Sequence, residues 1–108
     1  MKAGKLKESI LKRSVLKQLH KRNNDCLAGP GVGADYGAFA VSEETAVVMA
    51  SDPITLTQDA IGSSAILATC NDVACSGATV KGVSVTMLLP TSFNEEELRN
   101  LMKDMDKA

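Results

Sequence analysis

Three aspartates stand where the sequence predicts turns in the backbone or a polar interruption of a helix. Asp35 follows a glycine-rich run, Asp52 follows an apolar stretch, and Asp72 lies in a segment of small residues. Carboxylates that converge on folding repel one another, and a divalent cation or a proton relieves that repulsion. Mg²⁺ typically takes one or two carboxylates together with phosphate oxygens. The three aspartates are therefore candidate ligands of a metal and phosphate site.

The glycine-rich run, residues 29–35, is Gly-Pro-Gly-Val-Gly-Ala-Asp. Glycines let backbone amides approach a ligand closely, which makes Gly31 and Gly33 candidates for phosphate contact. The run precedes a predicted strand, whereas dinucleotide-binding and Walker loops open a helix, and the Walker lysine is absent. A tight turn that merely delivers Asp35 is the alternative interpretation.

Asp72 and its neighbour Asn71 occupy a predicted helix made mostly of small residues. An aspartate there has unfavourable helix propensity and risks burial of its charge. A metal ion would offset both costs. The alternative is that Asp72 caps a nearby amide or faces water.

Other catalytic chemistry has less support, and no catalytic residue is assigned. His20, the single histidine, lies among basic residues that favour a surface position, and no Ser-His-Asp pattern is present. Three cysteines, without a Cys-x-x-Cys pair, indicate neither a disulfide framework nor a zinc site. A reducing cytoplasm fits this cysteine content best.

The length of 108 residues predicts a single domain with a modest core. Aromatic residues make up only 3% of the chain, which argues against a reader of single-stranded nucleic acid. No apolar run is long enough to cross a bilayer, and no signal peptide is present. We therefore expect a soluble cytoplasmic protein that has no membrane partner.

The net charge of −1 conceals a basic amino-terminal segment. Residues 1–24 carry eight of the 12 basic residues and one of the 13 acidic residues. Such a segment can indicate a nucleic-acid or anionic-membrane partner. Apolar residues at helical spacing favour a solvated helix face docked on a core instead, and a nucleic-acid partner is not expected.

The periodicity predicts an α+β fold. Helices are expected over residues 5–22, over 60–75, and after an N-cap at Asn94, and strands over 26–28, 36–41, 45–50 and 80–89. This order of elements predicts a mixed or antiparallel four-stranded sheet with helices on one face. The other face would lie bare, so we expect a second copy to cover it, which predicts a homodimer.

These motifs together resemble the ATP-binding N-terminal half of the aminoimidazole ribonucleotide synthetase superfamily. The superfamily includes thiamine monophosphate kinase, selenophosphate synthetase and the hydrogenase maturation factor that dehydrates a carbamoyl group to a nitrile. Ser-Asp-Pro-Ile-Thr at 51–55 and Asn-Asp-Val-Ala at 71–74 make the hydrogenase-maturation branch the most similar. The resemblance covers nearly the whole chain, through residues 4–6, 29–35, 51–55, 61–62, 71–78 and 88–90.

The resemblance implies ATP near a barrel-like dimer interface, with Mg²⁺ held at its phosphates. Asp35, Asp52 and Asp72 would be the metal ligands, Asn71 a polar neighbour, and Gly31 and Gly33 part of the phosphate-side loop. The reaction common to the superfamily is activation of an oxygen by phosphorylation from ATP.

Departures from the family pattern leave a second interpretation open. Ala34 replaces an acidic residue often found beside the first aspartate, and Tyr36-Gly37 replaces an alanine pair. The family's C-terminal half is not expected within residues 1–108, so the chain would be an excised or split half, or a stand-alone relative that binds nucleotide without complete catalysis. We expect a Mg-ATP-binding domain that is incomplete for catalysis alone, or alternatively a dimerisation or regulatory module without nucleotide affinity.

Overall fold

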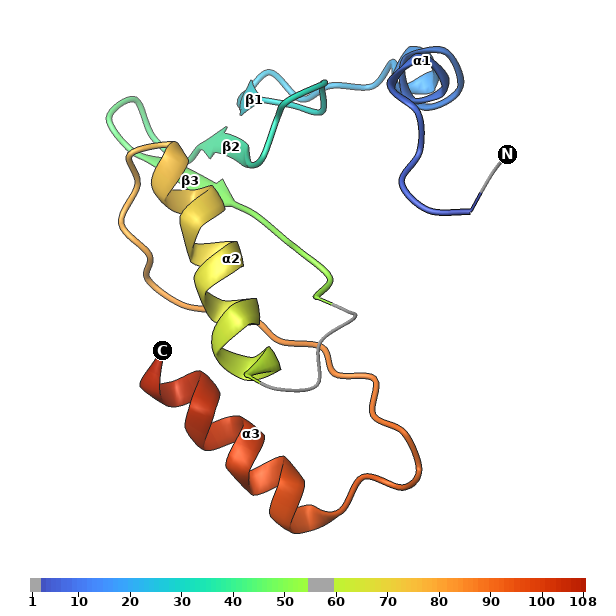
Figure 1. Ribbon diagram of the computed structural model, residues 1–108. Coiled ribbons are helices and arrows are strands. Elements are labelled where there is room, and N and C mark those ends of the chain that lie inside the picture. The colour runs from blue at the N-terminus through green and yellow to red at the C-terminus, as the bar shows by residue number, and fades with distance from the viewer. Residues whose placement is uncertain (1–2, 55–59) are drawn as a thin grey trace. The chain divides into compact units, whose positions relative to one another are not determined.

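The computed structural model describes residues 3–54 and 60–108, which divide between two compact units (Figure 1). The first unit is Met1–Met49 and contains a small sheet and a short helical segment. The second unit is Ala50–Ala108 and contains two longer helices. The fold class is α+β, as the periodicity predicts. No helix among the described residues is long and apolar enough to cross a membrane.

The sheet of the first unit has three antiparallel strands in the order β1, β2, β3. They are β1 (Cys26–Ala28), β2 (Gly37–Ala40) and β3 (Ala46–Met49). The hairpin that joins β2 to β3 is confirmed, and its turn is stabilised by the Ser42 hydroxyl, which accepts from the amides of Glu44 and Thr45 at 3.3 and 3.1 Å. Ala38 in the middle of β2 is 7% exposed and marks the centre of this sheet.

The amino-terminal helical segment is shorter than the predicted helix over residues 5–22. It runs through α1 (Glu8–Ile10), a π-helical stretch η1 (Leu11–Val15) and a 3₁₀ turn η2 (Leu16–Gln18). Leu19 has extended backbone angles, which end the helix. Val15 and Leu19 are exposed, so the apolar face predicted to dock on a core is not buried within this unit. A short helix without such packing is marginal in water, which fits its irregular geometry.

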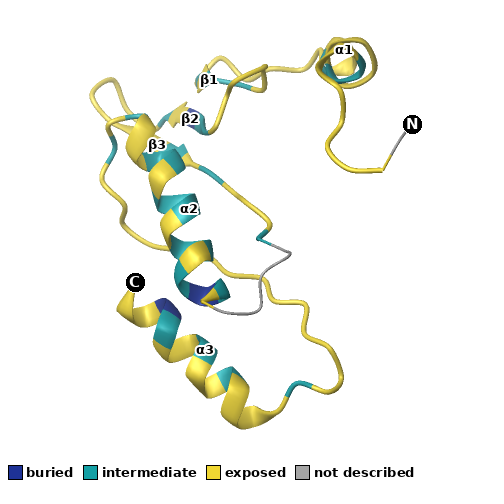
Figure 2. Cartoon of the chain, in the orientation of Figure 1, coloured by how far each residue is buried: buried dark blue, intermediate teal, exposed yellow. Residues whose placement is uncertain are grey.

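The second unit is held together by α2 (Ile61–Cys75) and α3 (Glu95–Lys107), which pack side by side (Figures 1 and 2). Gly62 on α2 and Met105 on α3 are the buried residues of the two helices. A Cβ atom on Gly62 would lie 2.8 Å from the Cγ of Met105, so only glycine allows this approach without displacement. The predicted end of α2 is confirmed, because Gly77 has a φ of +83° just after it.

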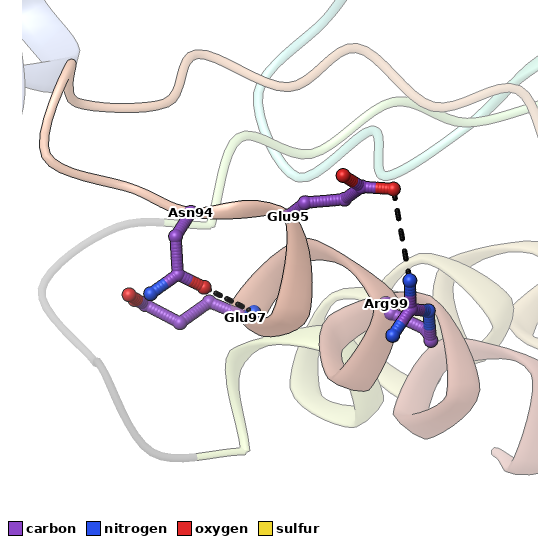
Figure 3. Close-up of polar contacts among 4 residues, drawn as sticks. All are labelled: Asn94, Glu95, Glu97 and Arg99. Atoms are coloured by element: carbon purple, nitrogen blue, oxygen red, sulfur yellow. Dashed lines mark hydrogen bonds and ion pairs between the residues drawn. The ribbon is translucent and has the colours of Figure 1, made fainter.

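The predicted N-cap of α3 is confirmed (Figure 3). The Asn94 side-chain oxygen accepts from the Glu97 amide at 2.8 Å, and Glu95, Glu96 and Glu97 occupy the first turn, where the helix dipole favours acidic residues. Glu95 also pairs with Arg99 at 3.6 Å. Both side chains of that pair are well exposed, so its contribution to stability is small.

We expect Asn94→Ala to lower the free energy of unfolding by about 1 kcal/mol, because the Glu97 amide loses its acceptor. Urea unfolding followed by circular dichroism measures this change. Asn100→Ala is the matched control, since Asn100 is exposed within the same helix. Equal losses in the two variants would contradict the capping role.

The strand predicted over residues 80–89 is not one of the three strands that the structure assigns. These residues form neither helix nor strand, and all of them are exposed, with Leu88 at 95% (Figure 2). Alternation of apolar and polar residues indicates a segment that could form a strand. A strand also requires a neighbouring backbone that pairs with its amides and carbonyls. Within the described part of the chain, the sheet is therefore three-stranded.

Candidate functional site

The second unit brings Asp52 and Asp72 together. Asp52 lies in the exposed segment before Pro53, and Asp72 is half-buried on α2. The hydrogen bond with Asp52 raises the pKa of Asp72 above its ordinary value, and partial burial and the negative charge of Asp52 act in the same direction. The two carboxyl groups therefore hold a proton between them more readily than two isolated aspartates would.

The surroundings of this carboxylate pair provide no basic partner. The last turn of α2, which contains Asp72, has no basic residue. Where the structure describes the chain, the two ion pairs join Lys12 to Glu8 and Arg99 to Glu95, and neither involves Asp52 or Asp72. A cation from solution is consequently the simplest partner for the pair in its ionised form.

Two hydroxyl groups close to Asp72 in the sequence are bonded to the backbone. The hydroxyls of Thr69 and Ser76 both donate to carbonyls of their own helix, at 2.9 and 2.6 Å. Their hydrogen-bonding capacity is thus directed to the backbone. Asn71, adjacent to Asp72, is exposed and available to a ligand.

The glycine loop lies in the first unit, between β1 and β2. The Ala34 amide donates to the Gly31 carbonyl at 3.2 Å, and Gly33 has a φ of +77°, so the loop makes a tight turn that favours glycine at position 33. No heavy atom lies within 4 Å of a Cβ built on Gly31 or Gly33. Asp35 follows in an exposed position. The loop is therefore open to a ligand.

Convergence of all three aspartates remains a prediction. Asp35 belongs to the first unit, whereas Asp52 and Asp72 belong to the second. Within each unit, the described residues contain no group of three or more His, Cys, Asp or Glu side chains placed to hold a metal ion. The pair Asp52 and Asp72 alone provides two carboxylates, which is the number that Mg²⁺ often takes when phosphate oxygens complete its shell. Thr55, from the motif at 51–55, lies outside the described residues.

A shallow hollow of about 250 Å³ lies at the β2–β3 hairpin, where sequence reasoning predicted no site. Its lining residues include Leu27, Ala40, Ser42, Glu43 and Glu44. The described residues include no buried polar side chain there or elsewhere. The polar side chains that line the hollow are exposed, so it gives no indication of a ligand.

The raised pKa of Asp72 predicts a pH dependence of stability in metal-free protein. The folded state retains a proton that the unfolded state releases, so the free energy of unfolding falls as pH rises from the ordinary pKa of aspartate through the raised pKa of Asp72. Asp72→Asn has no titrating group at this position and should lose this dependence. Urea unfolding in a chelator, at several pH values, measures the difference between the two proteins. Parallel stability curves would contradict the coupling.

Comparison with known proteins identifies one relationship. The family model described as "AIR synthase related protein, N-terminal domain" matches residues 33–108, which include Gly33, all three aspartates and Asn71. Gly31 lies just before the matched range. No curated protein and no solved structure matches the chain significantly.

Proposed function

This chain belongs to the AIR synthase-related family, and on that premise we propose that it is a Mg-ATP-binding domain of an ATP-dependent enzyme. The observation that carries the proposal is the contact between Asp52 and Asp72, which places two carboxyl groups together without a basic partner among the described residues. Two such groups could hold Mg²⁺, and the ion would then neutralise charge on the phosphates of a bound nucleotide.

The proposed site assigns a role to each candidate residue. Asp52 and Asp72 are ligands of Mg²⁺, and Asp35 is a third ligand that completes the trio. Asn71 is a polar neighbour of the ion or of the phosphates. The open loop at Gly31 and Gly33 presents backbone amides to a phosphate group, which its lack of neighbouring atoms supports.

Bound Mg²⁺ would neutralise charge on the phosphates of ATP. The chain's own residues would orient the nucleotide and hold the ion, which are the main protein contributions to phosphoryl transfer. Asp52 and Asp72 must be ionised to serve as ligands, so their shared proton has to leave when the ion binds. Affinity for Mg²⁺ should therefore increase with pH through the raised pKa of Asp72.

A homodimer is part of the proposal, with the sheets of two copies joined in a barrel-like core. Residues 80–89 support it, because they expose an apolar, alternating segment with no backbone partner in the described chain. In a dimer these residues would form the fourth strand of the sheet. The finer assignment is to a cytoplasmic enzyme like the hydrogenase maturation factor, with the rest of the catalytic machinery outside this domain or on a separate chain.

The second candidate is a dimerisation or regulatory module that keeps the fold and does not bind nucleotide. Ala34 favours it, because an acidic side chain often stands at this position in the family, beside the equivalent of Asp35. Without that acid, the first unit contributes fewer oxygen ligands to a cation.

Titration calorimetry with ATP, in the presence and absence of Mg²⁺, distinguishes the two candidates. A Mg-ATP-binding domain gives heat that requires Mg²⁺, whereas a module without nucleotide affinity gives none at millimolar ATP. Sedimentation of the same sample gives the solution mass and so tests the homodimer. Absence of heat from a dimeric, folded sample would overturn the Mg-ATP proposal in favour of the second candidate.

A further inference from the structure

Among the described residues, the N-cap position of α2 provides no side-chain cap. The residue at its N-cap position, Ala60, has a left-handed backbone with φ of 55° and no side-chain hydrogen bond to the helix. The first turn also contains no acidic residue. The amides at the start of a helix need acceptors from outside the helix, because they have no carbonyl partner within it.

Asp104, 41 residues later on α3, provides one of these acceptors. Its Oδ2 accepts from the Ser63 amide at 2.8 Å in a partly buried contact. A Cβ atom on Gly62 would lie 3.0 Å from the same oxygen, so the glycine leaves room for the carboxylate. The negative charge also interacts favourably with the positive end of the α2 dipole. Asp104 therefore acts as a capping acceptor for the first turn of α2, although it belongs to another helix.

We infer that Asp104 is a positioning residue for the proposed Mg²⁺ site: by capping and anchoring the start of α2, it fixes the direction in which that helix carries Asp72. The effect on Mg²⁺ binding rests on the proposed function, whereas the positioning of α2 by Asp104 does not. Ser63 and Asp72 are nine residues apart on one helix, which places them about 14 Å apart along its axis. Because the helix is rigid, a change in the direction of α2 at Ser63 also moves Asp72, the proposed ligand of Mg²⁺.

The anchor has a second consequence for the site. The start of a helix is a common position for phosphate, because free amides and the dipole both attract anions. At α2 the Ser63 amide is already bound to the Asp104 carboxylate. That amide is therefore not free to bind a phosphate of ATP.

Three variants test the inference in the full chain. Asp104→Ala removes the acceptor, Asp104→Asn keeps an acceptor oxygen and removes the charge, and Asp106→Ala is the matched control, since Asp106 is exposed on the same helix. Hydrogen exchange measures protection of the Ser63 amide, and residual dipolar couplings measure the angle between α2 and α3. Calorimetry with MgCl₂ alone measures affinity for the ion.

We expect Asp104→Ala to speed exchange of the Ser63 amide about tenfold, which corresponds to loss of a cap of about 1.4 kcal/mol. The angle between α2 and α3 should change, and affinity for Mg²⁺ should fall several-fold. Asp104→Asn should restore part of each property, and Asp106→Ala should leave all three unchanged. If Asp104→Ala does not fold, the same three measurements on Asp104→Asn and on the control Asp106→Ala test the inference.

An unchanged helix angle in a variant whose Ser63 amide has lost protection would overturn the positioning role. Unchanged Mg²⁺ affinity in such a variant, when the parent binds the ion, would also overturn it. If the parent protein binds no Mg²⁺, the proposed function fails, and the helix angle alone decides whether Asp104 positions α2.

Discussion

Asp72→Asn should remove the Mg²⁺-dependent part of ATP binding, with a loss of at least 10- to 100-fold in affinity. Mutation of groups that only support a metal ligand already costs this much, and loss of a ligand costs no less. The substitution keeps the size of the side chain and removes the charge that a divalent cation requires. Calorimetry with ATP at fixed Mg²⁺, on parent and variant, measures the effect.

The control for this prediction is Asp106→Asn, which makes the same chemical change at an exposed position on α3. Its ATP affinity should equal that of the parent. The metal-free Asp72→Asn protein should also be at least as stable as the parent near neutral pH, because the variant lacks the repulsion between the two carboxylates. Mg²⁺-dependent ATP binding that survives in a folded Asp72→Asn protein would show that Asp72 is not a ligand.

Gly62→Leu should destabilise the second unit by about 1.5–5 kcal/mol. Even a Cβ atom at this position would come within 3.0 Å of Met105, Asp104 and Leu101 side-chain atoms, and a leucine needs still more room. Overpacking costs about 1–3 kcal/mol, and loss of Met105 burial adds about 1.5–3 kcal/mol. Leucine has a better helix propensity than glycine, which offsets about 1 kcal/mol of this loss.

Ser64→Leu is the matched control, because Ser64 is exposed two residues further along α2. Chemical unfolding followed by circular dichroism compares the two variants with the parent. Ser64→Leu should change stability little. Leucine improves helix propensity there too, but it causes neither a steric clash nor a loss of Met105 burial. Equal stability of Gly62→Leu and Ser64→Leu would mean that α2 and α3 do not need their close approach.

Local signals in the sequence predicted the elements whose causes are local. The β2–β3 hairpin follows from two β-branched or small-residue runs with Ser-Glu-Glu between them, and in the structure the Ser42 hydroxyl accepts two hydrogen bonds in the turn. The start of α3 follows from Asn94 and three glutamates, and the end of α2 from Gly77. Each of these depends on residues within four positions of one another.

Elements that depend on distant partners were predicted less well. Residues 80–89 have strand periodicity, but no described backbone pairs with them, so the structure does not make them a strand. The amino-terminal helix has suitable spacing, but its apolar side chains lack a packed surface in their unit and it is short and irregular. Periodicity identifies which face of an element is apolar and does not identify what that face contacts.

The candidate site shows the same limit. Residue type and turn context identified Asp52 and Asp72, which the structure brings into contact. Nothing in the sequence indicated the bond from Ser63 to Asp104, because the acceptor lies on another helix. The sequence offers Asp59 as a local cap of α2, and that residue lies outside the described residues.

The exposed segment at residues 80–89 carries a risk while the protein is being synthesised. Apart from Lys81, these residues are uncharged, contain no proline and are rich in β-branched and other aliphatic side chains, which is the composition of segments that form cross-β aggregates. A newly made chain offers this backbone to any neighbour that reaches it first. Prompt assembly with a proper partner would therefore act as protection against misfolding, and cells that make this protein in excess of that partner should need chaperones to keep it from aggregating.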